Sequence, residues 1–459
     1  PVPGADLQLT IDERIQYVAE SELAKAVSAA DAHSGSLVAM DPNSGEILAL
    51  ANYPTFDPNK PPTTAAEFKS RTNLAVTAPF EPGSVFKVIT IATALETTRL
   101  TPNTPIFCNN GAFTLFRRVI HDAHPHGTLT LTEVLAKSSN IGSIKAALQI
   151  GNDRFYEYIR AFGFGQKTGL PLPGESGGTL RKTDRWIASS IGSVAMGHEL
   201  STTTVQLARA CSVIANGGYL VRPKLLRNEK NRQPPVQVLR PETAIKMRVM
   251  MRTVVDKGTG WRARPVGYST GGKTGSAQIY DAVNRVYTHR YNGSFMGFSP
   301  VSNPKIAIVI TLNGTRTGNA GFGGAVAAPV FQKVGAAALR FLDVPPDLPN
   351  DKGLRFMGDP GSQSDLASPE NAMPPEEDQQ ELPLVQVAAG TDTTDSAAPE
   401  WNGPRAPNLL GRTKREVLQQ ALSLGVPLQV AGSGVARKQE PGPGMPLPPG
   451  QVIRVQFAR

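Results

Sequence analysis

Apolar and polar residues along this chain recur with the periods of both helices and strands, which predicts a mixed α/β (α+β) fold. Near the start, apolar residues recur every three to four positions over residues 16–27, so we expect an amphipathic helix that Asp12 caps. Two apolar runs, at 36–40 and 46–50, flank Asp41-Pro42-Asn43-Ser44-Gly45. That is the composition of a tight turn between two strands, and it predicts a β-hairpin.

The pattern changes twice, which divides the chain into three predicted regions. Residues 1–344 mix helix and strand signals throughout and include a predicted buried strand at 305–311 and a closing helix at 325–342. Residues 345–403 carry Pro, Asp, Glu, Ser and Thr without periodicity. We expect a disordered linker there, because such a segment buries too little apolar surface to offset the entropy lost on ordering.

The last region, residues 404–459, is periodic again and is predicted to form a small separate domain. Its pattern predicts a helix at 413–424 and strands at 427–431 and 451–457. The unit has no repeat elsewhere in the chain.

The charge is unevenly spread. The formal net charge is +9, yet residues 359–400 hold ten acidic side chains and no Lys or Arg, which leaves 47 basic and 28 acidic side chains in the rest. A basic surface of that kind suits an anionic setting such as a cell wall or lipid headgroups. It is also compatible with a surface that is simply kept soluble by charge.

Cys108 and Cys211 are the only two cysteines, which excludes a disulfide-dense scaffold and a Cys-rich metal site. Cys211 falls within an apolar helical pattern, so we expect two buried, inert thiols rather than a disulfide. No run of 18 apolar residues and no signal peptide is present. Because the chain opens with Pro1, we expect a fragment or processed form that an N-terminal membrane anchor precedes.

The sharpest local motif is Phe80-Glu81-Pro82-Gly83-Ser84-Val85-Phe86-Lys87. Pro and Gly predict a turn, and the apolar run at 85–95 predicts a helix with Ser84 at its N-terminus, where the helix dipole favours developing negative charge. Lys87 shares a helix face with Ser84. A serine becomes a good nucleophile when a base takes its proton, and lysine is such a base when burial and a second cation lower its pKa. Alone, the pattern is more often a helix cap with a solvent-facing lysine.

Two further motifs follow in the order that this chemistry requires. Lys137-Ser138-Ser139-Asn140 comes after a predicted helix at 131–136, and Gly271–Ala277 reads Gly-Gly-Lys-Thr-Gly-Ser-Ala before strand-like sequence. Penicillin-interacting enzymes carry Ser-x-x-Lys, Ser-Asp-Asn and Lys-Thr-Gly in this order. Ser139 replaces the aspartate of the middle motif, at a position that does not carry the proton chemistry.

With these motifs the chain resembles, over residues 5–343, the transpeptidase domain of class B penicillin-binding proteins of the division or sporulation type. Supporting stretches outside the three motifs lie at 40–49, 162–175, 197–201 and 327–331. The resemblance implies a penicillin-binding transpeptidase fold, in which a five-stranded antiparallel sheet is flanked by helices. The active site then lies between this sheet and a mostly helical lobe.

The last region resembles a PASTA domain, a small β-α-β-β wall-binding module. The matching residues lie at 407–411, 432–435, 439–444 and 447–450. A module of this kind either binds the cell wall or serves as a structural cap without a ligand, and the sequence leaves both interpretations open.

The resemblance implies that the protein is a peptidoglycan D,D-transpeptidase. Ser84 would attack the carbonyl between the two D-alanines of a stem peptide, and Lys87 would take the serine proton. Ser138 would relay a proton to the leaving amine, while Asn140 holds Lys87 and the substrate amide. Lys273 would supply the second positive charge that keeps Lys87 neutral.

Substrate binding is expected from Thr274, Gly275, Ser276 and Ala277. The hydroxyls of Thr274 and Ser276 would bind the terminal carboxylate, and the backbone N–H groups of Ser84 and Ser276 would form the oxyanion hole. An amine from a neighbouring strand would then attack the acyl-enzyme. A β-lactam, which mimics D-Ala-D-Ala, would acylate Ser84 stably.

The implied partners are stem peptides ending in D-Ala-D-Ala, β-lactams, a glycosyltransferase and divisome proteins, with no nucleic acid. No metal and no organic cofactor is expected. The implied location is extracytoplasmic, in the periplasm or at the outer face of the cell membrane.

Several patterns suggest other chemistry but have more ordinary interpretations. Residues 267–274 fit a phosphate-binding loop, but the sequence after them has strand character. Residues 174–178 fit a nucleophile elbow but lie in Pro-rich sequence, and Lys167-Thr168-Gly169 lacks the small residues of the later motif. The remaining cases are histidines: His121, His124 and His126 beside Asp122 favour a turn over a metal site, and His198-Glu199 lacks a second histidine for a zinc-protease helix.

Two kinds of rival function remain at this point. A β-lactamase or a D,D-carboxypeptidase would carry the same three motifs. A penicillin sensor or division scaffold would keep the fold without the reaction, although the intact motif residues argue against an idle site.

Overall fold

A five-stranded antiparallel sheet forms the centre of the first of two compact units, residues 1–379 and 380–459. Its strands lie in the order β11 (Gly271–Asp281), β12 (Val286–Ser299), β13 (Ile306–Thr315), β1 (Ser34–Met40) and β2 (Ile47–Tyr53). The fold class and the five-stranded sheet are therefore confirmed.

The structure is a computed structural model. It describes residues 4, 6–116, 118–228, 234–281, 286–316, 318–349, 406–413, 416–417, 420, 428–432, 434–445 and 453–458. The expected linker falls almost wholly outside these residues, so the boundaries 345 and 403 stay predictions.

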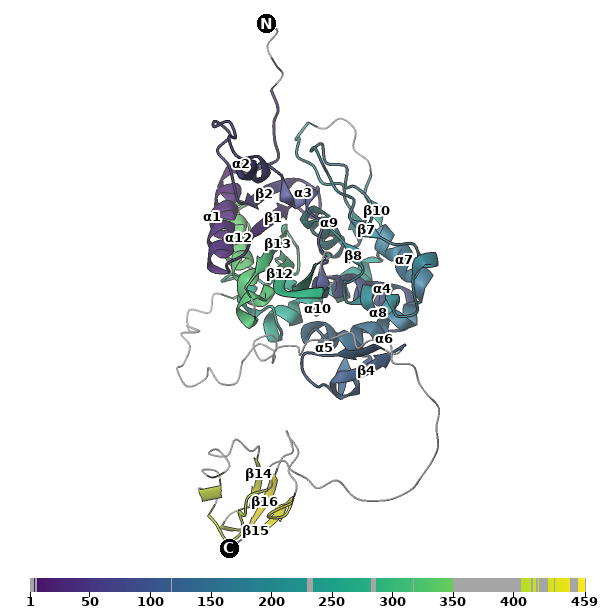
Figure 1. The fold of residues 1–459 in the computed structure, drawn as a ribbon, viewed down its shortest axis with the longest axis vertical. Helices are drawn as coiled ribbons and strands as arrows, with labels where there is room; N and C mark the ends of the chain where they lie inside the picture. Colours follow the sequence, from purple (N-terminus) through teal and green to yellow (C-terminus); the bar gives the residue numbers. More distant parts are fainter. Residues whose placement is uncertain are drawn as a thin grey trace. The chain divides into compact units, whose positions relative to one another are not determined.

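Helices cover both faces of the sheet, so its central strands are apolar on both sides. In β13 the side chains of Ile306, Ile308 and Ile310 pack with α1 (Glu13–Ala29) and α12 (Ala328–Phe341). Val309, on the opposite face, joins a core that includes α9 (Thr204–Ala215) and α4 (Lys87–Thr97). This three-layered arrangement is visible in Figure 1. It explains why the predicted strand at 305–311 is an unbroken apolar run, and that prediction is confirmed.

The first predicted elements are also confirmed. Asp12 caps α1, because its side chain accepts hydrogen bonds from the backbone N–H groups of Arg14 and Ile15. The predicted hairpin is the pair β1 and β2, with Val38 opposite Leu50.

The predicted closing helix at 325–342 is wrong in one respect, because the structure divides it. α11 (Gly323–Val326) ends before α12 begins at Ala328, and Ala327 lies between them. Pro329 explains the break: it has no backbone N–H, so it fits the first turn of a helix but not the interior.

Next to the sheet lies a mostly helical lobe, together with short two-stranded ribbons. Helices in and around this lobe include η1 (Gly83–Phe86), α4 (Lys87–Thr97), α5 (Leu131–Ala136), α6 (Asn140–Ile150), α7 (Asn152–Ala161), α8 (Ser190–Ala195) and α10 (Pro241–Lys257). The ribbons are β3 (Pro105–Phe107) with β6 (Thr128–Thr130), β4 (Ala112–Leu115) with β5 (Arg118–His121), β7 (Thr179–Leu180) with β8 (Leu200–Ser201), and β9 (Tyr219–Leu220) with β10 (Val236–Gln237). The predicted helix at 131–136 is α5, and Cys211 is buried in α9, as expected.

The C-terminal unit contains a three-stranded sheet of β14 (Leu428–Gly432), β16 (Ile453–Ala458) and β15 (Val435–Glu440), in that order. β14 pairs parallel with β16, and β15 pairs antiparallel with it. The two predicted strands are confirmed to within two residues. Most of the predicted helix at 413–424 lies outside the described residues.

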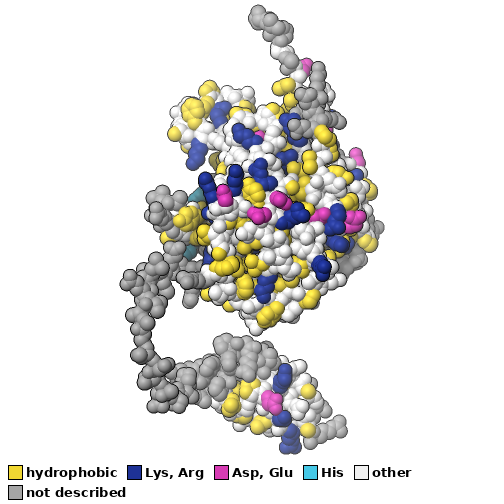
Figure 2. Space-filling model, turned by 90° about the vertical axis from the view of Figure 1, so that its right-hand side faces the viewer, with side chains coloured by type: hydrophobic (Ala, Val, Ile, Leu, Met, Phe, Trp, Pro, Cys, Tyr) yellow, Lys and Arg dark blue, Asp and Glu magenta, His cyan; other side chains and the backbone are white. Residues whose placement is uncertain are grey.

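Both cysteines are free and buried, which confirms the expected pair of unlinked thiols. Within the residues that the structure describes, every helix is too short or too polar to cross a bilayer. On the face of the first unit drawn in Figure 2, Lys and Arg side chains are interspersed with Asp and Glu rather than gathered in one basic patch.

Candidate active site

The turn that carries Ser84 lies directly against strand β11. A Cβ on Gly83 would lie 2.8 Å from the Cβ of Ala277, and a Cβ on Gly275 would lie 3.2 Å from the backbone nitrogen of Val85. These two close approaches place Ser84, which lies between Gly83 and Val85, across from Ser276. Any side chain at Gly275 would push the turn away from the strand, and Gly83 also has a positive φ of 55°.

Ser84 lies in a 3₁₀ turn, η1, and the α-helix α4 begins only at Lys87. The sequence predicted the helix from residue 85, so its start is two residues later than expected. The tighter 3₁₀ turn still leaves Ser84 and Lys87 in the same short helical segment, three residues apart. Ser84 is partly exposed, whereas Lys87 is fully buried.

Lys87 is held by the Ser138 motif across a sequence distance of about fifty residues. Its Nζ donates to the backbone carbonyl of Ser138 and, at 2.6 Å, to Oδ1 of Asn140. The Nζ also lies 3.3 Å from the hydroxyl of Ser138. Ser138 has a positive φ of 60°, and this left-handed turn after α5 points both its carbonyl and its hydroxyl at Lys87.

Lys273 approaches the same hydroxyl from the sheet. It is fully buried in β11, and its Nζ lies 2.9 Å from the Ser138 hydroxyl and 2.9 Å from the carbonyl oxygen of Thr274. One hydroxyl therefore lies between two buried amino groups. Burial and the proximity of a like charge both disfavour the state in which the two amines are protonated together. This is the environment in which a lysine can act as a base.

The last residues of the Lys273 motif occupy different environments. Thr274 is fully buried, and its hydroxyl lies 2.6 Å from that of Thr259. Ser276 is partly exposed, and its hydroxyl accepts a hydrogen bond of 3.0 Å from the backbone N–H of Gly323, at the start of α11. Ser276 is therefore the more accessible hydroxyl of the motif, and Ala277 is buried against the Ser84 turn.

Asp122 is a residue of this site that the sequence did not reveal. Its carboxylate accepts hydrogen bonds from the Ser139 hydroxyl at 2.6 Å, from the backbone N–H of Asn140, and from that of Ile141 at 3.0 Å. It therefore caps the N-terminus of α6, where a negative charge is favoured. Ser139 stands where the middle motif usually has an aspartate, and the carboxylate of Asp122, seventeen residues earlier, lies beside it.

The backbone next to Asp122 also orients Asn140. The carbonyl of His121 accepts from Nδ2 of Asn140 at 2.9 Å, so the amide oxygen turns toward Lys87. In the sequence, Asp122 was one member of a histidine-rich segment that was interpreted as an ordinary turn. Its spacing from Ser139 gives no signal, because the contact depends on the ribbon of β4 and β5 folding back onto α6.

A second missed residue is Glu81, which fixes the other side of the Ser84 turn. Its Oε1 accepts from the backbone N–H of Glu199 at 2.9 Å, and its Oε2 lies 2.9 Å from Nδ1 of His198. The N–H of Gly83 donates to the carbonyl of Gly197 at 3.1 Å. The segment at 197–201, noted above only as a supporting stretch, therefore braces the turn that carries Ser84.

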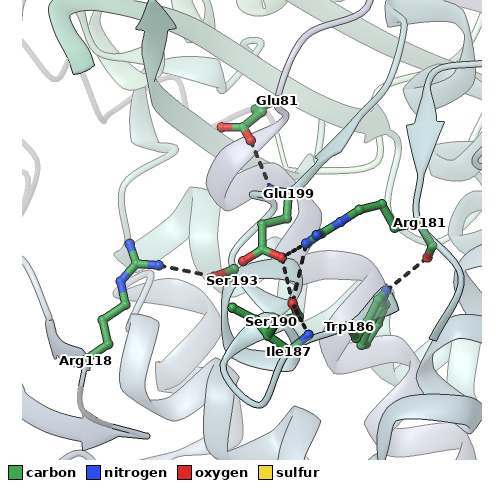
Figure 3. A network of polar contacts seen from close by, with 8 residues as sticks. All are labelled: Glu81, Arg118, Arg181, Trp186, Ile187, Ser190, Ser193 and Glu199. Carbon is green, nitrogen blue, oxygen red and sulfur yellow. Dashed lines mark hydrogen bonds and ion pairs between the residues drawn. The ribbon is translucent and has the colours of Figure 1, made fainter. Parts of the chain in front are cut away.

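Figure 3 shows how this bracing continues into the lobe. The carboxylate of Glu199 pairs with Arg181 and accepts from the Ser190 hydroxyl at 2.8 Å, and Nε1 of Trp186 donates to the carbonyl of Arg181 at 2.9 Å. Glu199 has a φ of 59°, a left-handed conformation that is costly for a non-glycine residue. These contacts hold it in place.

The alternative patterns in the sequence have the ordinary structures that were expected. Gly267–Thr274 runs into strand β11 and is not followed by a helix, which excludes a phosphate-binding loop. Residues 173–174 form a turn, and the irregular residues 175–178 lead into strand β7 rather than a helix. Lys167-Thr168-Gly169 lies in a loop where Thr168 binds Glu175. Within the described part of the chain, no group of three His, Cys, Asp or Glu side chains is placed to hold a metal ion.

Comparison with known proteins places both units in families. A family described as the penicillin binding protein transpeptidase domain matches residues 35–335, and the PASTA domain matches residues 404–459. The chain is 39% identical over 350 residues to a protein of Pseudomonas aeruginosa named "Probable peptidoglycan D,D-transpeptidase PbpC". The match covers 76% of this chain and 61% of that protein.

Two mycobacterial proteins are also similar. The chain is 36% identical to the penicillin-binding protein PbpB of Mycolicibacterium smegmatis, a match covering 75% of this chain and 56% of that protein. The solved structure of penicillin binding protein 3 from Mycobacterium tuberculosis, complexed with aztreonam, superposes with a TM-score of 0.71 at 33% identity. That match covers 76% of this chain and 82% of the other. The chain thus spans 61% of the length of the Pseudomonas aeruginosa relative and 56% of that of the Mycolicibacterium smegmatis relative.

Proposed function

Since the chain belongs to the penicillin-binding protein transpeptidase family and ends in a PASTA domain, we propose that it cross-links peptidoglycan as a serine D,D-transpeptidase. The observation that carries this proposal is the hydroxyl of Ser138, which lies 3.3 Å from the amine of Lys87 and 2.9 Å from that of Lys273. Beside it, the Ser84 turn is pressed against β11. An apolar cluster of similar size would stabilise the fold better than a buried amine pair with a bridging hydroxyl, so the pair indicates a functional role.

In the first half of the reaction, Lys87 accepts the proton of the Ser84 hydroxyl as the serine oxygen attacks the carbonyl between two D-alanines. The backbone N–H groups of Ser84 and Ser276 receive the oxyanion of the tetrahedral intermediate. Removal of one such donor costs about 2.7–4 kcal/mol of barrier in serine enzymes. Since these two residues lie across from each other, we expect their N–H groups to bind the same carbonyl oxygen.

Collapse of the intermediate breaks the C–N bond and releases D-alanine. The departing nitrogen needs a proton, and the Ser138 hydroxyl supplies it while taking from Lys87 the proton that Lys87 received from Ser84. Asn140 keeps Lys87 beside Ser138 during this exchange. The acyl group then remains on Ser84 as an ester until an amine of a neighbouring strand attacks it, which restores the serine hydroxyl.

The substrate's terminal carboxylate binds beside residues 273–276, in the first half of β11. Lys273 provides positive charge, and Ser276 provides the accessible hydroxyl. The contact of Thr274 with this carboxylate stays a prediction, since its hydroxyl is buried against Thr259. A β-lactam presents its carboxylate and its strained amide to the same groups, so it acylates Ser84 and leaves slowly.

The setting of the reaction follows from its substrate. Stem peptides lie outside the cytoplasm, so we propose an extracytoplasmic location with a membrane anchor ahead of this chain. A glycosyltransferase that extends glycan strands and the division proteins that recruit it are the proposed partners.

The test offers the protein a stem pentapeptide ending in D-Ala-D-Ala, with and without an acceptor amine, and follows the products by mass. A transpeptidase releases D-alanine and joins the shortened peptide to the amine. Release without joining identifies a carboxypeptidase instead.

A second arm of the test incubates the protein with a penicillin and follows its intact mass over hours. The proposal predicts an adduct that persists and that Ser84→Ala lacks. Rapid turnover of the drug would identify a β-lactamase, and an unreactive protein would favour a division scaffold.

A further inference from the structure

Between the Ser138 loop and the Lys273 strand lies a short turn, Gly258-Thr259-Gly260, that directly follows α10. The backbone N–H of Thr259 donates to the carbonyl of Ala136 at 3.4 Å. A Cβ on Gly258 would lie 2.4 Å from the same carbonyl oxygen, so only glycine allows this approach. The turn is therefore packed against the last residue of α5, two residues before Ser138.

The side chain of Thr259 contacts the other half of the site. Its hydroxyl lies 2.6 Å from the hydroxyl of Thr274, and both residues are buried, with exposed fractions of 1% and 0%. Thr274 in turn contacts Lys273 twice: its carbonyl accepts from Nζ at 2.9 Å, and its hydroxyl lies 3.5 Å from Nζ. One residue thus touches the segments that carry two of the three motifs.

The Thr259 hydroxyl constrains the hydroxyl of Thr274. A threonine hydroxyl has one proton to donate and two lone pairs that accept. A partner at 2.6 Å therefore restricts the direction in which the Thr274 hydroxyl points, and the oxygen of that hydroxyl lies 3.5 Å from the Lys273 amine. Loss of this buried contact changes the surroundings of an amine whose position at Ser138 is what catalysis requires.

We propose that Thr259 is a positioning residue. Through its backbone it fixes the end of α5, and through the Thr274 hydroxyl it holds the Lys273 amine against the hydroxyl of Ser138. It touches neither the substrate nor Ser84, so it acts through Lys273. The proposal rests on the transpeptidase function proposed above.

The experiment compares three variants of the full chain with the wild type. Thr259→Val removes the hydroxyl but keeps the shape and the backbone N–H, and Thr259→Ser keeps the hydroxyl. Thr253→Val is the matched control, because Thr253 lies in α10 and its hydroxyl bonds only the preceding turn, at Val249. Rapid-mixing kinetics with a fluorescent penicillin separate the dissociation constant of the first complex from the acylation rate constant.

We expect Thr259→Val to lower the acylation rate constant about tenfold, since the buried hydrogen bond between the Thr259 and Thr274 hydroxyls is lost. The dissociation constant should change less than about twofold. Thr259→Ser should restore most of the rate, and Thr253→Val should match the wild type.

Three results would overturn the inference: an unchanged rate in Thr259→Val, equal loss in the Val and Ser variants, or a loss confined to the dissociation constant. If Thr259→Val folds poorly, Thr259→Ala and Thr274→Val take its place. The protein that carries both Thr259→Ala and Thr274→Val should then have an acylation rate constant no lower than that of the slower single variant. A wild type that forms no adduct would instead refute the proposed function, which keeps the two failures distinct.

Discussion

Lysines in the two units of this chain show how environment decides what a residue can do. In the first unit, Lys87 and Lys273 are fully buried and share one hydroxyl. In the C-terminal unit, the side chain of Lys438 is 66% exposed and pairs with Glu440 across the surface. A surface pair of this kind is screened by water and contributes little. Burial and a neighbouring amine both disfavour the protonated form of a lysine, and this is the condition under which the proposed base, Lys87, can accept a proton.

The comparison predicts its largest effect at Lys87. Replacement by Met keeps the length and the apolar character of the side chain but removes the base. Since a positioned base contributes about 10²–10⁴-fold, we expect the penicillin acylation rate to fall about a thousandfold. The matched change, Lys438→Met, should leave the rate as it is. A modest loss of acylation rate in Lys87→Met, comparable to that in Lys438→Met, would contradict the role of the buried Lys87 as the base.

A smaller effect is expected at Asp122, which supports the site from outside. Asp122→Ala removes the acceptor of the Asn140 and Ile141 N–H groups at the start of α6, while Ser139 still accepts from Gly142, so we expect about 0.5–2 kcal/mol lower stability. The acylation rate should fall about tenfold, because Asn140 then holds Lys87 less well. Thermal unfolding and the penicillin assay measure the two effects. Asp122→Asn retains an acceptor oxygen and should lie between the wild type and the alanine variant; if it is as slow as Asp122→Ala, the charge rather than the cap is what matters.

The smallest effect is expected from the C-terminal unit. Val455 is buried in the small core of that unit, and Val455→Asp places a charge there without a partner. The unit should unfold, which loss of its separate unfolding transition would show, while the acylation rate stays within about twofold of the wild type. A large fall in acylation would mean that the active site depends on the C-terminal unit, which would contradict this prediction.

The sequence predicted the elements that local patterns control. The helix after Asp12, the hairpin of β1 and β2, and strand β13 follow from hydrophobic periodicity and turn composition, and the structure confirms them. The two-residue error at α4 and the break at Ala327 both arise at helix ends. There, a 3₁₀ turn or a proline decides between helix boundaries that the local sequence favours almost equally.

The motifs identified the residues that converge on Ser138, but the supporting residues could not be predicted. Asp122, Glu81 and Thr259 act through contacts with segments distant in the sequence. Asp122 and Thr259 lie outside the three motifs, and the position of Glu81 beside the Ser84 motif does not indicate its contacts with residues 198 and 199. Asp122 even lay within a segment that was interpreted as an ordinary turn. Such residues are defined by the tertiary fold, in which a ribbon, a loop and a helix end meet around the same lysines.

The most direct test of the central claim is to locate the covalent bond. Wild-type protein and Ser84→Ala are incubated with a penicillin, digested, and sequenced by fragment mass. The account predicts one modified peptide, with the drug on Ser84, and none in the variant. A drug molecule attached to another residue, or equal labelling of both proteins, would contradict it.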